Sequence, residues 1–289
     1  MGRLLRVTFD ETRGGTRVGD VKATFSSELK IDCSGNRTAS ISTNQAQVSI
    51  TNISRELRDH LSDKYRPINN QINNQDGLSG RIVIEAGNDA SGYSQVFEGG
   101  VIEVRTGSPP DIVTTFTVVS NDRYKGVASS WSFGSVTTIS QLTNQIAGVL
   151  NLAPNLQLSK AEASYTIVNA QLDGVSADLP RLLDQIPGVS ATVDKGVLSV
   201  RPSFEKVGGQ SVIKVNKDTG MIGTPRFLDS GIEVTILFNP DISVNSLIKT
   251  SSQLVPGTNG VWKVVNIFFE LHNREAPFYY TLKCLPVYS

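Results

Sequence analysis

The sequence predicts a mainly β protein with a small α+β module inserted in its middle. Residues 81–123 hold β-branched runs separated by Gly, Asn and Pro, and residues 232–284 hold further runs that alternate apolar and polar residues. Between them, residues 138–150 and 179–186 repeat apolar residues at helical spacing. The two ends are therefore expected to form β-barrels or β-sandwiches that flank the α+β module.

Three domains follow from these changes of pattern. We place a β domain with one short helix at residues 1–125, the α+β domain at 126–205 and a second β-barrel domain at 206–289. Gly208-Gly209 reads as the linker before the last domain. With 289 residues and 39% hydrophobic residues, the chain can supply a core for each of them.

The first domain is expected to be a rolled sheet with one helix packed on it. Its strands are predicted at Leu4–Phe9, Val21–Phe25, Leu29–Cys33, residues 46–50, 82–84, 101–104 after a Gly99-Gly100 turn, and 112–119. Asn52 or Ser54 can cap the helix. Its inward stripe is formed by Ile53, Leu57 and Leu61, and Arg55 can pair with Asp59 on the other side.

The middle domain alternates helices with strands. Thr137 or Thr138 can cap a helix whose apolar face is Ile139, Leu142, Ile146 and Leu150. A strand at Tyr165–Ala170 precedes a second helix, capped by Ser176 or Asp178, with Leu179, Leu182, Leu183 and Ile186 facing inward. Residues 191–193 and 197–200 are expected to form a hairpin around Asp194-Lys195-Gly196.

The third domain again shows strands with turns between them. Strands are predicted at residues 232–238, 261–271 and 279–284. Asn216–Gly220 resembles the start of a calcium loop, but the following positions lack the carboxylates that such a loop requires, so this segment is interpreted as a turn.

Two parts of the chain resemble one protein family. The strand, "NIS" turn and amphipathic helix of Ala46–Leu61, followed by "IVIEAGND", "QVFEGGVIEV" and "FTVVSND", resemble the tube-like domain of central baseplate hub proteins in contractile-tailed bacteriophages and related injection machines. Asn245–Lys249, Asn259–Val265 and Phe278–Val287 resemble the closing barrel of the same proteins. The middle module resembles the small domains inserted in hub proteins and in secretin-type rings.

The resemblance implies a structural hub subunit with two tail-tube-like domains. It implies a homotrimer whose ring connects the tail tube protein to the central spike protein and meets baseplate wedge or adaptor proteins. DNA would pass through the channel without specific binding. The protein is then expected in the virion baseplate after assembly in the host cytoplasm. The Asn- and Gln-rich loop at residues 66–80 is either a solvated connection or, as the family implies, a contact with adjoining tail proteins.

No catalytic, cofactor-binding or metal-ligating residue is predicted, and we expect the protein not to be an enzyme. His60 and His272 lack the spacing of a metal site, so each is expected to be solvated or to cap a turn. Gly14–Asp20 ends in Asp where a phosphate-binding loop needs Lys. The sequence leaves the interface residues unknown.

Two alternatives stay open. The chain could be a wall-degrading or carbohydrate-binding tail component, although acidic residues such as Glu56, Asp59, Glu103 and Glu233 suggest no catalytic pair. The aromatic residues that could stack on sugars are expected in the core or at an interface: Trp131, Trp262, Phe268, Phe269, Phe278, Tyr279 and Tyr280. The chain could also be the hub or tube initiator of a non-contractile tail or of a bacterial injection system.

The charge balance and the cysteine content limit which partners and which covalent links are expected. Lys+Arg and Asp+Glu both number 27, so no net charge favours nucleic acid or an anionic membrane. No signal sequence and no apolar run of the ~20 residues that a membrane helix needs is found. Cys33 and Cys284 are expected to be free, half-buried thiols, and the sequence leaves open whether they are close.

Overall fold

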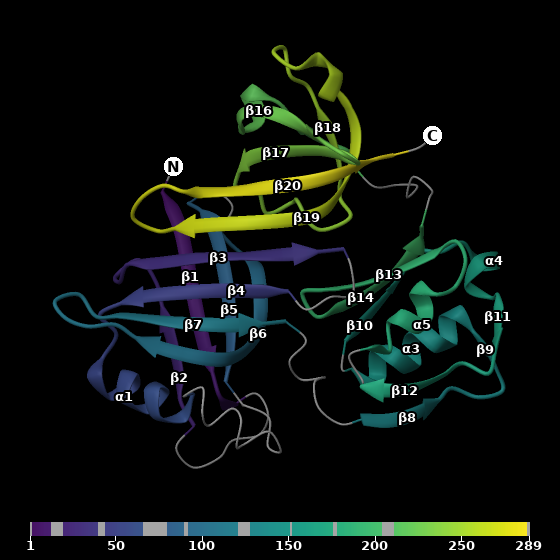
Figure 1. The fold of residues 1–289 in the computed structure, drawn as a ribbon, viewed down its shortest axis with the longest axis horizontal. Helices are drawn as coiled ribbons and strands as arrows, with labels where there is room; N and C mark the ends of the chain where they lie inside the picture. Colours follow the sequence, from purple (N-terminus) through teal and green to yellow (C-terminus); the bar gives the residue numbers. More distant parts are fainter. Residues whose placement is uncertain are drawn as a thin grey trace.

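The computed structural model describes residues 2–12, 20–39, 44–65, 80–89, 92–120, 128–150, 152–175, 178–203 and 211–287 (Figure 1). Several predictions fall outside these residues, among them those for residues 14–19 of the Gly14–Asp20 segment, the Asn- and Gln-rich loop at 66–79 and the Gly208-Gly209 linker. The fold is mainly β, with an α+β module inserted between strands β7 and β15, as the sequence predicts.

One sheet of 13 strands forms most of the described molecule. The longest path through it runs β16-β17-β20-β19-β3-β4-β7-β6-β5-β1-β2, and β15 and β18 attach to it through β19. The strands from the N-terminal part are β1 Arg3–Asp10, β2 Lys22–Phe25, β3 Ile31–Thr38, β4 Gln45–Thr51, β5 Arg81–Asn88, β6 Gly92–Thr106 and β7 Val113–Val119. The strands from the C-terminal part are β15 Ile213–Val215, β16 Met221–Leu228, β17 Gly231–Leu237, β18 Leu247–Thr250, β19 Gly260–His272 and β20 Phe278–Pro286.

The first and third parts of the chain meet where β3 pairs with β19. The two strands are antiparallel, and their register runs from Thr38 opposite Asn266 to Asp32 opposite His272. Figure 1 shows the C-terminal strands continuing the N-terminal sheet across this pair. Both parts also contribute to one cluster of buried apolar residues. We call the β3–β19 pair the seam; the division of the chain into three domains stays a prediction.

The helix α1, Arg55–Lys64, confirms the predicted cap and stripe. The Ser54 hydroxyl accepts a hydrogen bond from the backbone N–H of Leu57. Ile53 and Leu61 are buried and Leu57 packs on the same core. Arg55 and Asp59 form the expected ion pair at 3.4 Å on the exposed side.

The segment from β5 to β7 contains the three predicted strands, but the predicted Gly99-Gly100 turn is wrong. Both glycines lie inside β6, which spans 15 residues. A Cβ on Gly99 would lie 2.4 Å from the carbonyl oxygen of Val119, so glycine is required there because β7 approaches closely. The chain turns instead after β5 and between Thr106 and Val113.

The α+β module has its own core and its own small sheets. Its strands are β8 Ala128–Ser132, β9 Val136–Thr138, β10 Ala153–Leu156, β11 Thr166–Val168, β12 Gln171–Val175, β13 Val189–Asp194 and β14 Val197–Pro202. Its helices are α3 Ile139–Val149, α4 Lys160–Ala163 and α5 Arg181–Asp184. Helix α3 packs its apolar face into a core distinct from that of the main sheet.

Of the helix caps predicted in this module, the one for α3 is confirmed and the one by Asp178 is wrong. Thr138 caps α3 in a capping box with Gln141, as predicted. The predicted cap of the second helix by Asp178 is wrong, because α5 begins after Pro180 without any side-chain cap and Asp178 pairs with Arg181 at 3.1 Å. The other predicted cap, Ser176, lies outside the described residues.

The β13–β14 hairpin turns as predicted. Lys195 and Gly196 both have positive φ, 51° and 77°, as a two-residue hairpin turn requires. In the third part of the chain, Asn216 caps the short 3-10 turn η4 (Lys217–Thr219), which confirms the turn predicted there. No helix among the described residues is long and apolar enough to cross a membrane.

Candidate functional site

A buried ion pair connects the main sheet to the α+β module. Arg37 lies on β3 with its side chain 1% exposed, and it points inward because β3 alternates and Arg37 is opposite the buried Ile267. Its Nε donates a hydrogen bond of 3.0 Å to Asp194 Oδ1, and its Nη2 donates to Asp194 Oδ2. The tip of the β13–β14 hairpin is thereby fixed to the seam.

Further contacts follow along the same hairpin. The Asn245 side chain, 3% exposed, donates to the Thr192 hydroxyl at 3.4 Å, and the Asn245 backbone N–H donates to the Val264 carbonyl of β19. Burial and the neighbouring Arg37 charge lower the pKa of Lys195 to about 8. The module therefore rests on the seam through buried polar groups that require a defined position.

A fully buried carboxylate, that of Glu11, fixes helix α1 to the antiparallel pair of β1 and β2. Glu11 is 0% exposed and accepts hydrogen bonds from the Tyr65 hydroxyl at 2.7 Å and the Val21 backbone at 2.8 Å. His60 Nε2 and Lys64 Nζ lie 3.0 and 3.1 Å from it. Burial alone would raise the pKa of Glu11, but these hydrogen bonds outweigh burial and lower the pKa.

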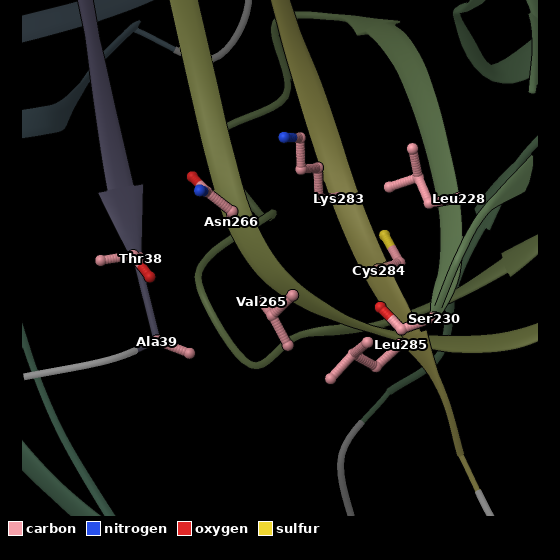
Figure 2. A pocket seen from close by; sticks show the side chains of 9 residues that line it. All are labelled: Thr38, Ala39, Leu228, Ser230, Val265, Asn266, Lys283, Cys284 and Leu285. Atoms are coloured by element: carbon pink, nitrogen blue, oxygen red, sulfur yellow. The ribbon is translucent and has the colours of Figure 1, made fainter. Parts of the chain in front are cut away.

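A pocket of about 300 Å³ opens at the end of the seam (Figure 2). It lies beside the β-bulge of β19 between Val264 and Asn266. Its lining residues are Thr38, Ala39, Leu228, Ser230, Val265, Asn266, Lys283, Cys284 and Leu285. These nine residues include no carboxylate and no histidine, so the lining lacks the pair of carboxylates that glycoside hydrolysis requires.

The two cysteines are fully buried rather than half-buried, because both occupy inward positions of strands. Cys33 and Cys284 are each 1% exposed and free. Cys33 lies opposite Leu271 on β19, and Cys284 lies opposite Val264 on the other side of β19. That separation along a strand is roughly 20 Å, which excludes a disulfide between them.

The predicted histidine environments are only partly right. Each histidine is about one quarter to one third exposed, and each lies beside a carboxylate: His60 by Glu11 and His272 Nδ1 at 3.4 Å from Asp32 Oδ1. The sequence did not pair them because their partners are 49 and 240 residues away, and only the sheet brings them together.

The acidic and aromatic residues considered from the sequence occupy structural positions. Asp59, Glu103 and Glu233 each pair with an arginine, at 3.4, 2.6 and 2.6 Å. Phe269, Phe278 and Tyr280 are buried, and Trp262 packs on the main core. Trp131 packs on the core of the module. Phe268 and Tyr279 are partly exposed, on the outer face of their strands.

Exposed apolar side chains lie on β16, at the end of β17 and in the loop after β18. Phe227 is 60% exposed, Leu237 55% and Leu254 80%. Gly257 of the loop that carries Leu254 approaches the Phe227 ring. Leu237 points to the other face of the sheet, because Phe227 is opposite Ile232 and side chains alternate from Ile232 to Leu237 along β17. We call Phe227 and Leu254 the β16 patch. Strand β16 also ends the longest path through the sheet, so among the described residues an unpaired strand edge coincides with exposed apolar side chains, as at surfaces that bind other proteins.

The comparison with protein families decides the class of the molecule. Residues 4–284 match the family described as Baseplate hub gp41. The chain belongs to this family of baseplate hub proteins. It is therefore a structural component of a bacteriophage tail, and its place is the baseplate of the virion. The resemblance found in the sequence is confirmed.

Solved structures share the fold at low identity. The tail protein from Neisseria meningitidis MC58 aligns with a TM-score of 0.63 and 9% identity, covering 99% of this chain and 96% of that chain. The 43 kDa tail protein of prophage MuSo2 from Shewanella oneidensis aligns with a TM-score of 0.60 and 10% identity, covering 98% and 99%.

A third similar structure comes from a secretion system. It is the E. coli c3393 protein, described as a component of the type VI secretion system with structural similarity to T4 bacteriophage tail proteins gp27 and gp5; the TM-score is 0.57 and the identity 10%, covering 90% of this chain and 74% of that chain. No curated protein matches the sequence. Because these identities are low, the solved structures show a shared fold and the family match carries the role.

Proposed function

We propose that three copies of this baseplate hub protein close into a ring that connects the tail tube to the central spike. The observation that carries the proposal is the seam, because it holds both β units of a subunit in one sheet with one core. Three subunits, each with two tube-like units, would present six such units to a hexameric tube and threefold symmetry to a trimeric spike.

The partners in this proposal are the tail tube protein, the central spike protein and baseplate wedge or adaptor proteins. The β16 patch would be covered by the next subunit of the ring, since its apolar side chains are poorly suited to water and the strand edge offers N–H and C=O groups for pairing with another chain. DNA would pass through the ring without specific binding, in keeping with the equal numbers of acidic and basic residues. Assembly would take place in the host cytoplasm.

The hub subunit would act without catalysis. Asp59, Glu103 and Glu233 are engaged with arginines, and the pocket lining holds no carboxylate. No observation among the described residues favours the wall-degrading or carbohydrate-binding alternative. Incubation of purified peptidoglycan with the protein should release no soluble fragments, and a release that survives further purification would overturn this part of the proposal.

The ring is tested by the mass of the purified protein in solution. Light scattering over a range of concentrations should give three times the 31.2 kDa of one chain, either alone or after addition of the spike. Phe227→Asp should reduce the trimer to the monomer, because a charge would be buried in the interface. Val149→Asp is the matched control, since Val149 is 48% exposed on helix α3, away from the β16 patch.

Each outcome decides the proposal. A protein that stays monomeric with its spike present would overturn the ring. A trimer that both aspartate variants leave intact would keep the ring but remove the β16 patch from its interface.

A further inference from the structure

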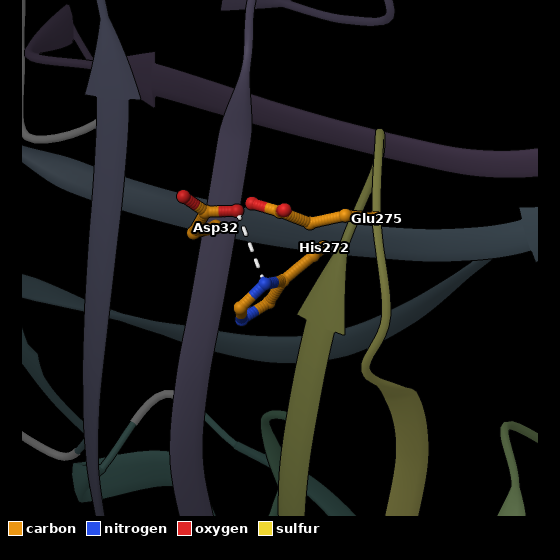
Figure 3. Close-up of side chains that lie close together, drawn as sticks. All are labelled: Asp32, His272 and Glu275. Atoms are coloured by element: carbon orange, nitrogen blue, oxygen red, sulfur yellow. Dashed lines mark ion pairs between the residues drawn. The ribbon is translucent and has the colours of Figure 1, made fainter.

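Three potential metal ligands from both β parts of the chain meet at the other end of the seam. Asp32 lies on β3, His272 is the last residue of β19, and Glu275 lies in the turn before β20. Their ligand atoms all lie within 4.8 Å of one another. Figure 3 shows the three side chains converging, with the Asp32 and Glu275 carboxylates and the His272 ring directed toward one another.

Two of the potential ligand atoms are close together and buried, yet make no hydrogen bond within the part of the chain that the structure describes. Asp32 Oδ1 and His272 Nδ1 are 3.4 Å apart, the contact drawn as a dashed line in Figure 3. Both atoms are hidden from solvent, and neither has a hydrogen-bond partner among the described residues. A carboxylate and an imidazole could each find hydrogen bonds in water, so leaving both without one needs a compensating interaction, either their own ion pair when His272 is protonated or a cation bound between them.

Their separation fits a shared metal ion. Zinc bonds of about 2.0–2.2 Å to nitrogen and oxygen in a tetrahedron place neighbouring ligand atoms roughly 3.3 Å apart. Two lone-pair atoms that face one space without a hydrogen bond, at that spacing, are what two ligands of one ion require. A third ligand from Glu275 would leave the fourth position for water.

We propose that Asp32, His272 and Glu275 bind one Zn²⁺ ion, which links the N-terminal and C-terminal β parts of the chain across the seam. Imidazole with carboxylates favours zinc over the all-oxygen surroundings that Ca²⁺ and Mg²⁺ prefer. The ion would join β3 to the β19–β20 turn, which already meets β3 through Asn273, whose Oδ1 accepts a hydrogen bond of 2.9 Å from the Ile31 backbone N–H.

Lys30 competes for the same carboxylates. Its Nζ lies 2.5 Å from Glu275 Oε1 and 3.9 Å from Asp32 Oδ2. The ammonium group thus neutralises part of the site without metal, and zinc has to displace it from Glu275. Removal of Lys30 should therefore strengthen zinc binding, whereas removal of a ligand should weaken it.

The test is titration of the full chain with zinc chloride after removal of metal by a chelator and dialysis. Calorimetry should show one zinc ion bound per chain. His272→Gln should weaken binding about 100-fold, and Lys30→Met should strengthen it roughly tenfold. His60→Gln is the matched control, because His60 is the other histidine of the sequence and also lies beside a carboxylate; its affinity for zinc should equal that of the unmodified protein.

A second measurement separates binding from folding. Each variant is first compared with the unmodified protein by circular dichroism in chelator, and Asp32→Asn, which keeps its shape, replaces any His272 variant that does not fold. Saturating zinc should raise the Tm of the unmodified protein and of His60→Gln, but not that of Asp32→Asn. Absence of zinc binding, or binding that is lost in His60→Gln and kept in His272→Gln, would overturn the proposal.

Discussion

Arg37 on the first β part of the chain and Asp194 on the α+β module form a two-bond ion pair at the seam, with the guanidinium almost completely buried. The two residues are 157 positions apart in the sequence. Because a buried charge without its partner is strongly unfavourable, this pair fixes where the module sits on the sheet.

Removal of the acidic partner should destabilise the fold. Asp194→Asn leaves the Arg37 charge buried without a counter-charge, and we expect the free energy of unfolding to fall by about 3 kcal/mol. Glu233→Gln is the control: its partner Arg226 is 70% exposed, so the loss should stay below about 1 kcal/mol. Urea denaturation measures both. Equal losses in the two variants would show that the buried Arg37–Asp194 pair contributes no more to the free energy of unfolding than the exposed pair does.

The seam should tolerate no side chain at Gly35. A Cβ on Gly35 would lie 2.6 Å from both the Gln45 carbonyl oxygen and the Phe269 ring. Gly35→Ala should therefore cost about 1–3 kcal/mol in the free energy of unfolding. Gly148→Ala, in helix α3 with no described atom within 4 Å of the new methyl group, should stabilise the protein by about 0.5–1 kcal/mol. Thermal denaturation of the two variants should shift in opposite directions.

The buried Glu11 should make stability depend on pH in the acid range. Its pKa is lowered in the folded state, so its contribution is present above the unfolded pKa of about 4.3 and is lost as pH falls through the folded pKa. Glu11→Gln should cost about 2 kcal/mol at pH 7. Between pH 5 and pH 3 its stability should also fall less than that of the unmodified protein, as urea denaturation would show. Parallel pH profiles would contradict this assignment.

Neither thiol should react in the folded protein. Burial, and secondarily the charge of Asp32, strongly raises the pKa of Cys33, and burial raises that of Cys284 to about 12. A thiol reagent at pH 8 should therefore label no cysteine before unfolding and two after it. Ser251→Cys, at an exposed position, should add one thiol that reacts at once. Rapid labelling of the unmodified protein would show that the strands around Cys33 or Cys284 open readily.

The sequence predicts local structure best where one segment carries its own signal. The cap of Ser54, the capping box of Thr138 and the turn at Lys195-Gly196 each depend on neighbours within a few positions. The Gly99-Gly100 turn was wrong because the reason for Gly99 lies on another strand, where β7 comes too close for a side chain. Glycine occurs both in turns and where a neighbouring strand approaches closely, and the sequence alone does not distinguish the two.

The buried polar groups could be found only in part. Arg37 lies in step with Ile31 and Cys33, so a strand extended past Cys33 places it inward; the expected strand ended too early. Its need for Asp194 could not be predicted, because the partner belongs to a different unit. For the same reason the sequence analysis did not connect His272 with Asp32, although the register of the seam puts them opposite each other.

The seam also determines how the hub subunit would transmit force. Antiparallel hydrogen bonds lie across the strands, so a pull along β3 and β19 loads all of their paired residues together, from Thr38–Asn266 to Asp32–His272. A pull at right angles would instead open the bonds one after another from one end. A tail that drives its tube along the strand direction would thus meet a stiff subunit, whereas a sideways load would peel the same subunit apart.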